Sequence, residues 1–222
     1  MSWVTGGFLT ALTGVDAVHG RISQVAAPRS RAEQKRHTRA LIVEAGRRAV
    51  ASRGFSGLIV RELAREAGLV PTAFYRHFES VDDLASELAT GAADGLGLLV
   101  DDLVAAPGDP AVDWPGVAVD AAIRDGRTWE VLARGLVDTA HPDHQVLAGA
   151  VDSARRRLGI TLGRLDALSR ADDTAVDIAA DLVVVVLIRV LVEVSVGHDA
   201  RTVAEEGTGR LRIILAGAAA TP

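Results

Sequence analysis

The residues with the clearest chemical potential lie in a short string at positions 71–78. Phe74 and Phe78 stand four positions apart, so on a helix they share one face and would be buried against neighbouring helices. The opposite face then carries small residues and hydrogen-bond donors, namely Thr72, Ala73, Arg76 and His77. An α-helix fits the major groove of B-DNA, where arginine donates to guanine O6 and N7 and a threonine methyl group contacts thymine. The string therefore predicts a helix that reads DNA bases.

Three helices joined by short turns are expected to position this string. Residues 31–52 carry an apolar stripe beneath a basic face. Residues 60–67 repeat apolar side chains at the helical period and are followed by Gly68, a residue type that readily ends a helix. Pro71 then opens a third helix, which we expect to run to about Phe78. Two short helices with a tight glycine-containing turn between them, the second one exposed, are typical of the helix-turn-helix.

Charge divides the chain into two parts. Residues 29–78 contain 11 Lys or Arg and 4 Asp or Glu, whereas residues 79–222 contain 12 and 24 of these. A basic segment of this kind suits binding to a polyanion, while phosphate would repel the acidic remainder. A solvated charged face would give the same counts, so charge alone leaves both interpretations open.

Composition excludes several classes of protein. The sequence has 222 residues, 49% of them hydrophobic, which is enough for one or two globular domains. It has no Cys, which excludes disulfide scaffolds, thiol catalysis and cysteine-ligated zinc. Its longest apolar run, residues 182–188, is far shorter than the ~20 residues that cross a bilayer. Residues 1–20 lack the features of a signal peptide, so we expect a cytoplasmic protein without a membrane span.

Motifs of enzymes are missing from the sequence. It contains no G-x-S-x-G string, P-loop or Rossmann glycine pattern. Two histidines and an aspartate come close together at positions 141–144, as in some metal sites, but Pro142 favours a helix start at which these residues cap the helix. We therefore expect no catalytic residues, no metal and no cofactor.

The chain beyond position 79 is expected to form further helices. Ser80 can cap a helix that links the basic segment to the acidic remainder of the chain, with Asp83 three residues on. Later helices are expected at residues 111–124, 128–138, 142–167, 172–196 and 201–218.

Large apolar side chains in this part could line a pocket for a hydrophobic ligand between helices. The candidates are Trp114, Trp129, Leu132 and Leu136. Core packing is the alternative for each of them. Three arginines could pair with an anionic group of the ligand at the pocket mouth, or with carboxylates nearby on the surface: Arg124, Arg127 and Arg134.

Residues 182–188 are apolar on every side of a helix, which requires cover from the protomer's own core and from a second subunit. A symmetric four-helix interface is therefore expected, and its residues would include Leu182, Val186, Val190, Val194 and Ile214. Arg189 and Glu193 are four positions apart and most simply pair with each other. The pattern predicts a homodimer.

The residues around the third helix also resemble a known family. Residues 60–67 (VRELAREA) and 68–78 (GLVPTAFYRHF) are similar to the DNA-binding domain of TetR-type transcriptional repressors, over roughly residues 38–88. The resemblance implies that Thr72, Ala73 and Arg76 face bases, and that Tyr75 and His77 hold phosphates. The full set of expected DNA-binding residues is Lys35, Arg39, Pro71, Thr72, Ala73, Tyr75, Arg76 and His77. Packing on the helical core is the alternative for Tyr75 and His77.

Two positions depart from the family pattern. Gly57-Leu58-Ile59 stands where the family usually has a Thr or Ser that caps the second helix, and residues 80–83 lack the Lys that often opens the fourth. The string at 71–82 resembles, more weakly, the branch of the family that represses unsaturated fatty-acid synthesis. That branch implies lipid-related target genes and an acyl effector such as a fatty acyl-CoA.

The sequence as a whole predicts an all-α regulator with an N-terminal three-helix helix-turn-helix domain and a C-terminal helical domain for ligand binding and dimerisation. Residues 1–28 are expected to be a flexible extension, residues 29–79 the DNA-binding domain, and residues 80–222 the C-terminal domain. The expected partners are double-stranded DNA with a near-palindromic operator, a hydrophobic small molecule and a second copy of the chain. Two alternatives stay open: a regulator that responds to another apolar molecule, and a hydrophobic-ligand carrier that binds nucleic acid without sequence preference.

Overall fold

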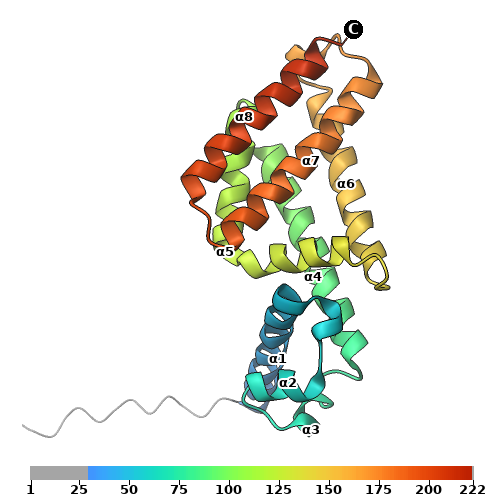
Figure 1. The fold of residues 1–222 in the computed structure, drawn as a ribbon, viewed down its shortest axis with the longest axis vertical. Helices are drawn as coiled ribbons and strands as arrows, with labels where there is room; N and C mark the ends of the chain where they lie inside the picture. The colour runs from blue at the N-terminus through green and yellow to red at the C-terminus, as the bar shows by residue number, and fades with distance from the viewer. Residues whose placement is uncertain (1–29, 222) are drawn as a thin grey trace, which may run out of the picture.

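The computed structural model describes residues 30–221, and within that range it contains eight α-helices and no strand (Figure 1). The prediction of an all-α fold with an N-terminal helix-turn-helix domain is confirmed. The expected N-terminal extension, residues 1–28, lies outside the described residues. The helices are α1 (Arg31–Arg53), α2 (Val60–Glu66), α3 (Pro71–Phe74), α4 (Val81–Ala105), α5 (Pro110–Val137), α6 (His144–Leu162), α7 (Asp173–Ser195) and α8 (Ala200–Ala219).

Helices α1, α2 and α3 form the lower part of the molecule in Figure 1. Helix α1 begins with a capping box, in which the Ser30 hydroxyl accepts from the Glu33 backbone N–H and the Glu33 carboxylate accepts from the Ser30 N–H. It ends at Gly54, whose φ of +75° is a conformation that favours glycine. Gly68, with φ +70°, makes the turn between α2 and α3 in the same way. A glycine with positive φ therefore follows each of the helices α1 and α2.

Helix α3 is shorter than predicted. It was expected to reach about Phe78, but it ends at Phe74. The Arg76 N–H donates to the Ala73 carbonyl and the His77 N–H donates to the Phe74 carbonyl, so the chain tightens into i→i−3 bonds after Phe74. These bonds form the turn that leads to Ser80, where the next helix is capped.

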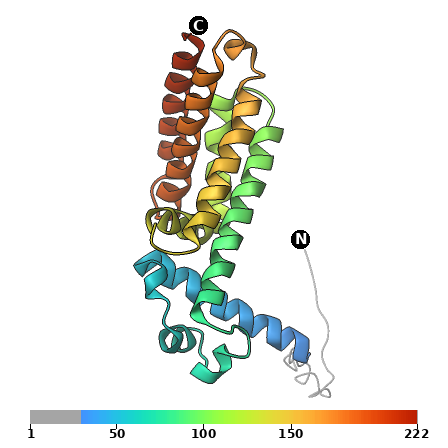
Figure 2. The ribbon, with the colours of Figure 1, turned by 90° about the vertical axis from the view of Figure 1, so that its right-hand side faces the viewer.

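Helix α4 runs without a break from the helix-turn-helix domain into the upper helical body (Figure 2). Its predicted cap is confirmed, because the Ser80 hydroxyl accepts from the Asp83 N–H at 3.1 Å. Its buried stripe includes Leu84 and Leu88 in the lower part, and Leu96, Leu99 and Leu103 in the upper part. One rigid helix therefore carries side chains into the cores of both parts.

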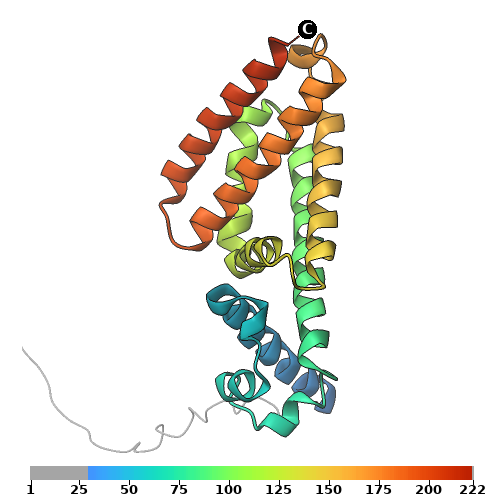
Figure 3. The same ribbon diagram turned by 45° about the vertical axis from the view of Figure 1, so that its right-hand side comes forward.

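The upper body consists of the upper half of α4 and helices α5 to α8: α5 and α6 pack on α4, and α8 packs on α5 and α7 (Figure 3). The two helices expected at 111–124 and 128–138 form one element, α5, with a sharp bend at Asp125 (φ −149°, ψ 68°). Helix α6 ends at Leu162, earlier than the predicted residue 167, and a short 3₁₀ helix at Asp166–Leu168 comes after it. Helices α7 and α8 lie side by side along one face of the body.

The predicted capping role of residues 141–144 is wrong in its detail. Helix α6 begins at His144 with Asp143 at its N-cap position, but the Asp143 side chain makes no capping hydrogen bond. Its carboxylate instead accepts from the Ser86 hydroxyl of α4 at 2.9 Å. The His141 ring stacks on Phe55, with ring centroids 4.7 Å apart. This turn therefore fastens the body to α4 and to the segment between α1 and α2.

Candidate nucleic-acid interface

Residues 71–78, which contain α3 and the turn after it, are held by two phenylalanines and expose the opposite side. Phe74 and Phe78 are buried, with ring centroids 5.5 Å apart. Pro71, Thr72 and Arg76 are exposed, whereas Ala73 and His77 are half-buried. The face expected to read bases is therefore free of the protein core.

Tyr75 packs against the helical core and is also exposed to solvent. Its ring packs against the Phe74 ring in a T-shaped arrangement, with ring centroids 5.5 Å apart, yet 60% of the residue is exposed. An anchored aromatic ring that keeps a free hydroxyl is suited to donate a hydrogen bond to a phosphate oxygen.

A groove of about 490 Å³ lies between the start of α1 and helix α3. It is lined by Arg31, Gln34, Lys35, Thr38, Leu69, Ala73, Arg76 and His77. The fold thus brings Lys35, which the sequence assigned to the DNA backbone, to the same groove as Arg76. Arg31 and Gln34, which are not in the set of eight expected DNA-binding residues, also line this groove.

His77 lies among positive charges. Burial lowers the pKa of His77 from its ordinary value, and the charges of Lys35, Arg39 and Arg76 lower that pKa further. Burial and these charges therefore favour the neutral form of the His77 imidazole in the free protein. Its Nδ1 is buried and has no hydrogen-bond partner among the described residues.

The structure places Arg39 differently from the other expected contacts. Its guanidinium makes a two-pronged ion pair with the carboxylate of Glu87 on α4. It also lies 4.7 Å from the centroid of the Phe78 ring. Arg39 therefore connects α1 with α4 and with Phe78, the residue four positions after the end of α3. It does not line the groove.

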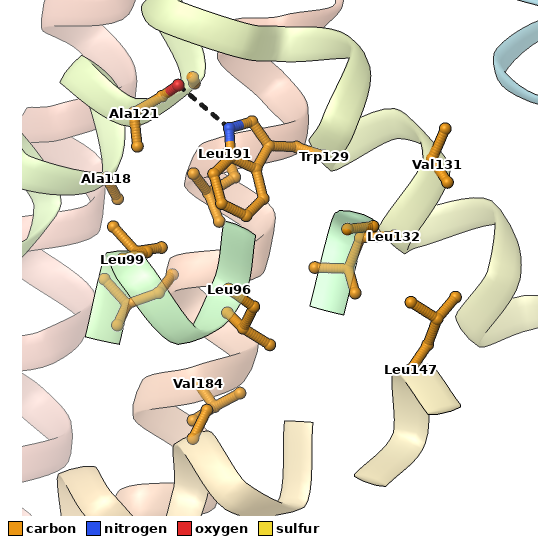
Figure 4. Packing of buried hydrophobic residues seen from close by; sticks show 14 of the residues in the cluster. Leu96, Leu99, Ala118, Ala121, Trp129, Val131, Leu132, Leu147, Val184 and Leu191 are labelled. Carbon is orange, nitrogen blue, oxygen red and sulfur yellow. Dashed lines mark hydrogen bonds between the residues drawn. The ribbon is translucent and has the colours of Figure 1, made fainter. Parts of the chain in front are cut away.

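The four residues expected to line a ligand pocket lie in the core of the body. Trp114, Trp129 and Leu132 are buried and Leu136 is half-buried. Figure 4 shows Trp129 among Leu96, Leu99 and Leu191, and its indole N–H donates to the Ala121 carbonyl at 3.1 Å. A separate small void of about 10 Å³ has only aliphatic walls, formed by Leu96, Leu99, Val100, Leu103, Ala154, Leu158, Val184, Leu187, Ile188 and Leu191.

The three arginines proposed for the pocket mouth are engaged with other protein groups. Arg124 pairs with Asp102 at 3.4 Å, and Arg127 pairs with Glu44 at 2.9 Å. The Arg134 Nε donates to the Ala51 carbonyl at 3.1 Å. Two of these partners, Glu44 and Ala51, belong to α1, which could not be foreseen from the sequence.

An apolar face runs along α7 and α8. Leu182 is 45% exposed, and Ile178, Val185 and Ile213 beside it are also exposed. Val194 and Ile214 are half-buried. Val186 and Val190 are buried in the protomer's own core, so they are not surface residues as the expected interface required. The predicted Arg189–Glu193 pair is present at 2.7 Å.

Between α7 and α8 this face is hollowed into a groove of about 390 Å³, whose walls include Ile178, Leu182 and Ile213.

Across residues 30–221, no helix is both long and apolar enough to span a membrane. Among those same residues, no group of three or more His, Cys, Asp or Glu is placed to hold a metal ion.

Helices α1 to α3 form a helix-turn-helix fold, and several basic residues line the groove beside α3. Residues 42–88 match the model of the family described as bacterial regulatory proteins, tetR family. This match confirms the resemblance to TetR-type regulators that is predicted over roughly residues 38–88.

Solved structures with the same fold extend the likeness over most of the chain. A transcriptional regulator from Rhodococcus sp. Rha1 is 20% identical, with a TM-score of 0.63 over 83% of this chain and 99% of that one. A TetR-family regulator from Streptomyces coelicolor is 17% identical, with a TM-score of 0.63 over 83% and 97%. A regulator from Pseudomonas aeruginosa PAO1, at 22% identity and a TM-score of 0.63, aligns over 86% and 95%. The chain therefore has the overall fold of TetR-family transcriptional regulators.

Proposed function

We propose that this chain is a cytoplasmic, homodimeric transcriptional repressor that reads a near-palindromic DNA operator through α3. The groove that joins the start of α1 to α3 is the observation that supports this most directly, because it sets Lys35, Arg76 and His77 beside the exposed face of α3. Backbone contacts position such a protein on DNA, and base contacts specify the sequence. The groove offers side chains for both.

In this proposal, Thr72, Ala73 and Arg76 face bases while Pro71, Tyr75, His77 and Lys35 contact the backbone. A phosphate beside His77 would offset the surrounding positive charges and favour the protonated imidazole. The pairing of Arg39 with Glu87 gives that residue a positioning role, because it fixes α1 and the Phe78 ring against α4.

The second copy is proposed to cover the face of α7 and α8 that includes Ile178, Leu182, Val185 and Ile213. Each of these large apolar side chains is exposed in the single chain. A two-fold axis at this face would form a four-helix interface and present two copies of α3 to two half-sites. Helices α7 and α8 thus have one face for the core and one for the partner.

Arg76→Ala and Lys35→Ala are expected to affect DNA binding in different ways. Loss of an arginine that reads guanine should cost about 1–3 kcal/mol at the preferred site and relax the preference for its sequence. Loss of the lysine should weaken all duplexes about equally and reduce the slope of log affinity against log salt by about 1. Fluorescence anisotropy with a selected and a scrambled duplex, at several salt concentrations, measures both. Identical behaviour of the two variants would contradict the assignment of bases to Arg76 and phosphates to Lys35.

We further propose that the effector is an acyl compound and that the repressed genes serve lipid metabolism. The string at 71–82 supports this through its resemblance to the fatty-acid branch of the family. The void enclosed by α4, α6 and α7 supports it independently, because its walls are aliphatic and would accept a hydrocarbon chain that parts the helices.

A panel of fatty acids and acyl-CoAs of increasing chain length tests the effector. A member at 100 times its Kd should stabilise the protein by about 2.7 kcal/mol and change its affinity for DNA. Leu99→Ala enlarges the void and should change the preferred chain length, whereas Leu98→Ala, a neighbouring exposed leucine, should not. If aromatic or other non-acyl apolar molecules shift the melting temperature and acyl compounds do not, the acyl assignment is wrong.

A further inference from the structure

The bend in α5 lies where the body meets the helix-turn-helix domain. Beyond Asp125, the second half of α5 crosses beneath the body and passes over the end of α1 (Figures 1 and 3). The Asp125 carboxylate accepts from the Thr128 hydroxyl at 2.7 Å, which links the bend to the first turn of the second half of α5. Asp125 therefore lies at the point where α5 changes direction.

Two crossed ion pairs join this bend to α1. Arg47 of α1 donates to both carboxylate oxygens of Asp125, at 3.0 and 3.3 Å. Arg127 of α5 pairs with Glu44 of α1 at 2.9 Å. Each helix supplies one acid and one base, so a shift or rotation of either helix along the other would bring like charges together. The pairs thus fix the register of α1 on α5.

The charge network continues into the helix-turn-helix motif. Glu44 also pairs with Arg48 at 3.4 Å, and Arg48 pairs with Glu66 of α2 at 3.2 Å. A chain of alternating charges therefore leads from the bend, through α1, to the helix that precedes α3.

The bend is also fixed on its other side. A Cβ atom added to Gly126 would lie 3.1 to 3.3 Å from the side chain and Cα of Ser195, at the end of α7. The bend therefore contacts two elements. One is α7, which carries part of the exposed apolar face proposed for dimerisation, and the other is α1 of the helix-turn-helix domain.

We propose that Arg47–Asp125 and Glu44–Arg127 are positioning pairs that set the orientation of the helix-turn-helix domain relative to the body. Exposed ion pairs contribute little to stability, on the order of 0–1 kcal/mol each, so their effect is on orientation. A movement of the second half of α5 is transmitted to α1 and α2 through these contacts. The consequence for DNA binding rests on the function proposed above, whereas the effect on orientation does not.

The orientation can be measured directly, because the chain has no native Cys. Ser56→Cys in the segment between α1 and α2 and Ser153→Cys on α6 provide two exposed positions for spin labels. Mixing labelled with excess unlabelled protein leaves only the distance within one protomer, which double electron–electron resonance reports. Affinity for a selected duplex is measured in parallel, together with the melting temperature.

Arg127→Glu places two acids opposite each other and should broaden or shift the distance distribution, with a change of a few degrees at most in melting temperature. Affinity for the palindromic duplex should fall about tenfold, within the usual range of coupling between sites. Glu44→Arg combined with Arg127→Glu puts opposite charges back across this contact and should recover part of both changes; recovery is partial because the swap removes the pair between Glu44 and Arg48. Arg124→Glu, which breaks the pair with Asp102 within the body, is the matched control and should change neither.

An unchanged distance distribution in Arg127→Glu, or a charge swap that recovers none of the change, would overturn the proposal. If Arg127→Glu does not fold, Arg127→Gln removes the attraction without adding repulsion and should broaden the same distribution. Should the native chain bind no duplex while the distances behave as expected, the proposed function fails and the positioning role stands.

Discussion

Phe74→Ala should abolish DNA binding by unfolding the N-terminal domain. Phe74 is fully buried and packs against Phe78 and Tyr75, with ring centroids 5.5 Å away in each case. Replacing a buried phenylalanine by alanine typically costs about 3–5 kcal/mol. The core of this domain is small and shares helix α4 with the body. A loss of this size is therefore large relative to the total free energy of unfolding of the domain.

Urea unfolding followed by circular dichroism, and anisotropy with a selected duplex, measure these effects. Val70→Ala is the matched control, because Val70 lies one position before α3 and is exposed, and it should leave the free energy of unfolding nearly unchanged. Native-like affinity for DNA in Phe74→Ala would mean that the two phenylalanines do not hold α3.

Leu182→Asp should dissociate the dimer and with it most of the affinity for a palindromic operator. The substitution places a charge at the centre of the exposed apolar face, next to Ile178 and Val185 on the same side of α7. A charge buried at an interface without a partner is strongly unfavourable. Because two linked binding modules gain about 10²–10⁴-fold over one, the loss of operator affinity should fall in that range.

Sedimentation velocity gives the oligomeric state, and anisotropy gives the affinity. Leu98→Asp introduces the same charge at an exposed leucine of α4, away from this face, and should leave the protein dimeric. A Leu182→Asp variant that stays dimeric would place the interface elsewhere.

Features set by neighbouring residues could be predicted from the sequence. The cap of α4 at Ser80, the glycine turns at Gly54 and Gly68 and the burial of Phe74 and Phe78 all depend on side chains within a few positions of one another. The helix-turn-helix and its exposed face result from these local signals. The family match over residues 42–88 covers the same segment.

Features set by distant residues could not be predicted in this way. Arg39 is among the expected DNA-binding residues, and its ion pair with Glu87 could not be foreseen because the two residues lie 48 positions apart in the sequence. Arg47 and Asp125, which meet at the bend of α5, are 78 residues apart. For α7, the apolar sequence predicted contacts with both the protomer's own core and a second subunit. It did not predict which residues make each contact: Val190 is buried in the core, whereas Leu182 is exposed.

Selection of duplexes from a randomised library, followed by footprinting of the enriched sequence, tests the central claim most directly. A homodimer that reads DNA through α3 should enrich a near-palindrome and protect two half-sites about one helical turn apart, ~34–36 Å between their centres. Enrichment of no sequence, with equal affinity for all duplexes at moderate salt, would contradict the account and favour a carrier that binds nucleic acid only through charge.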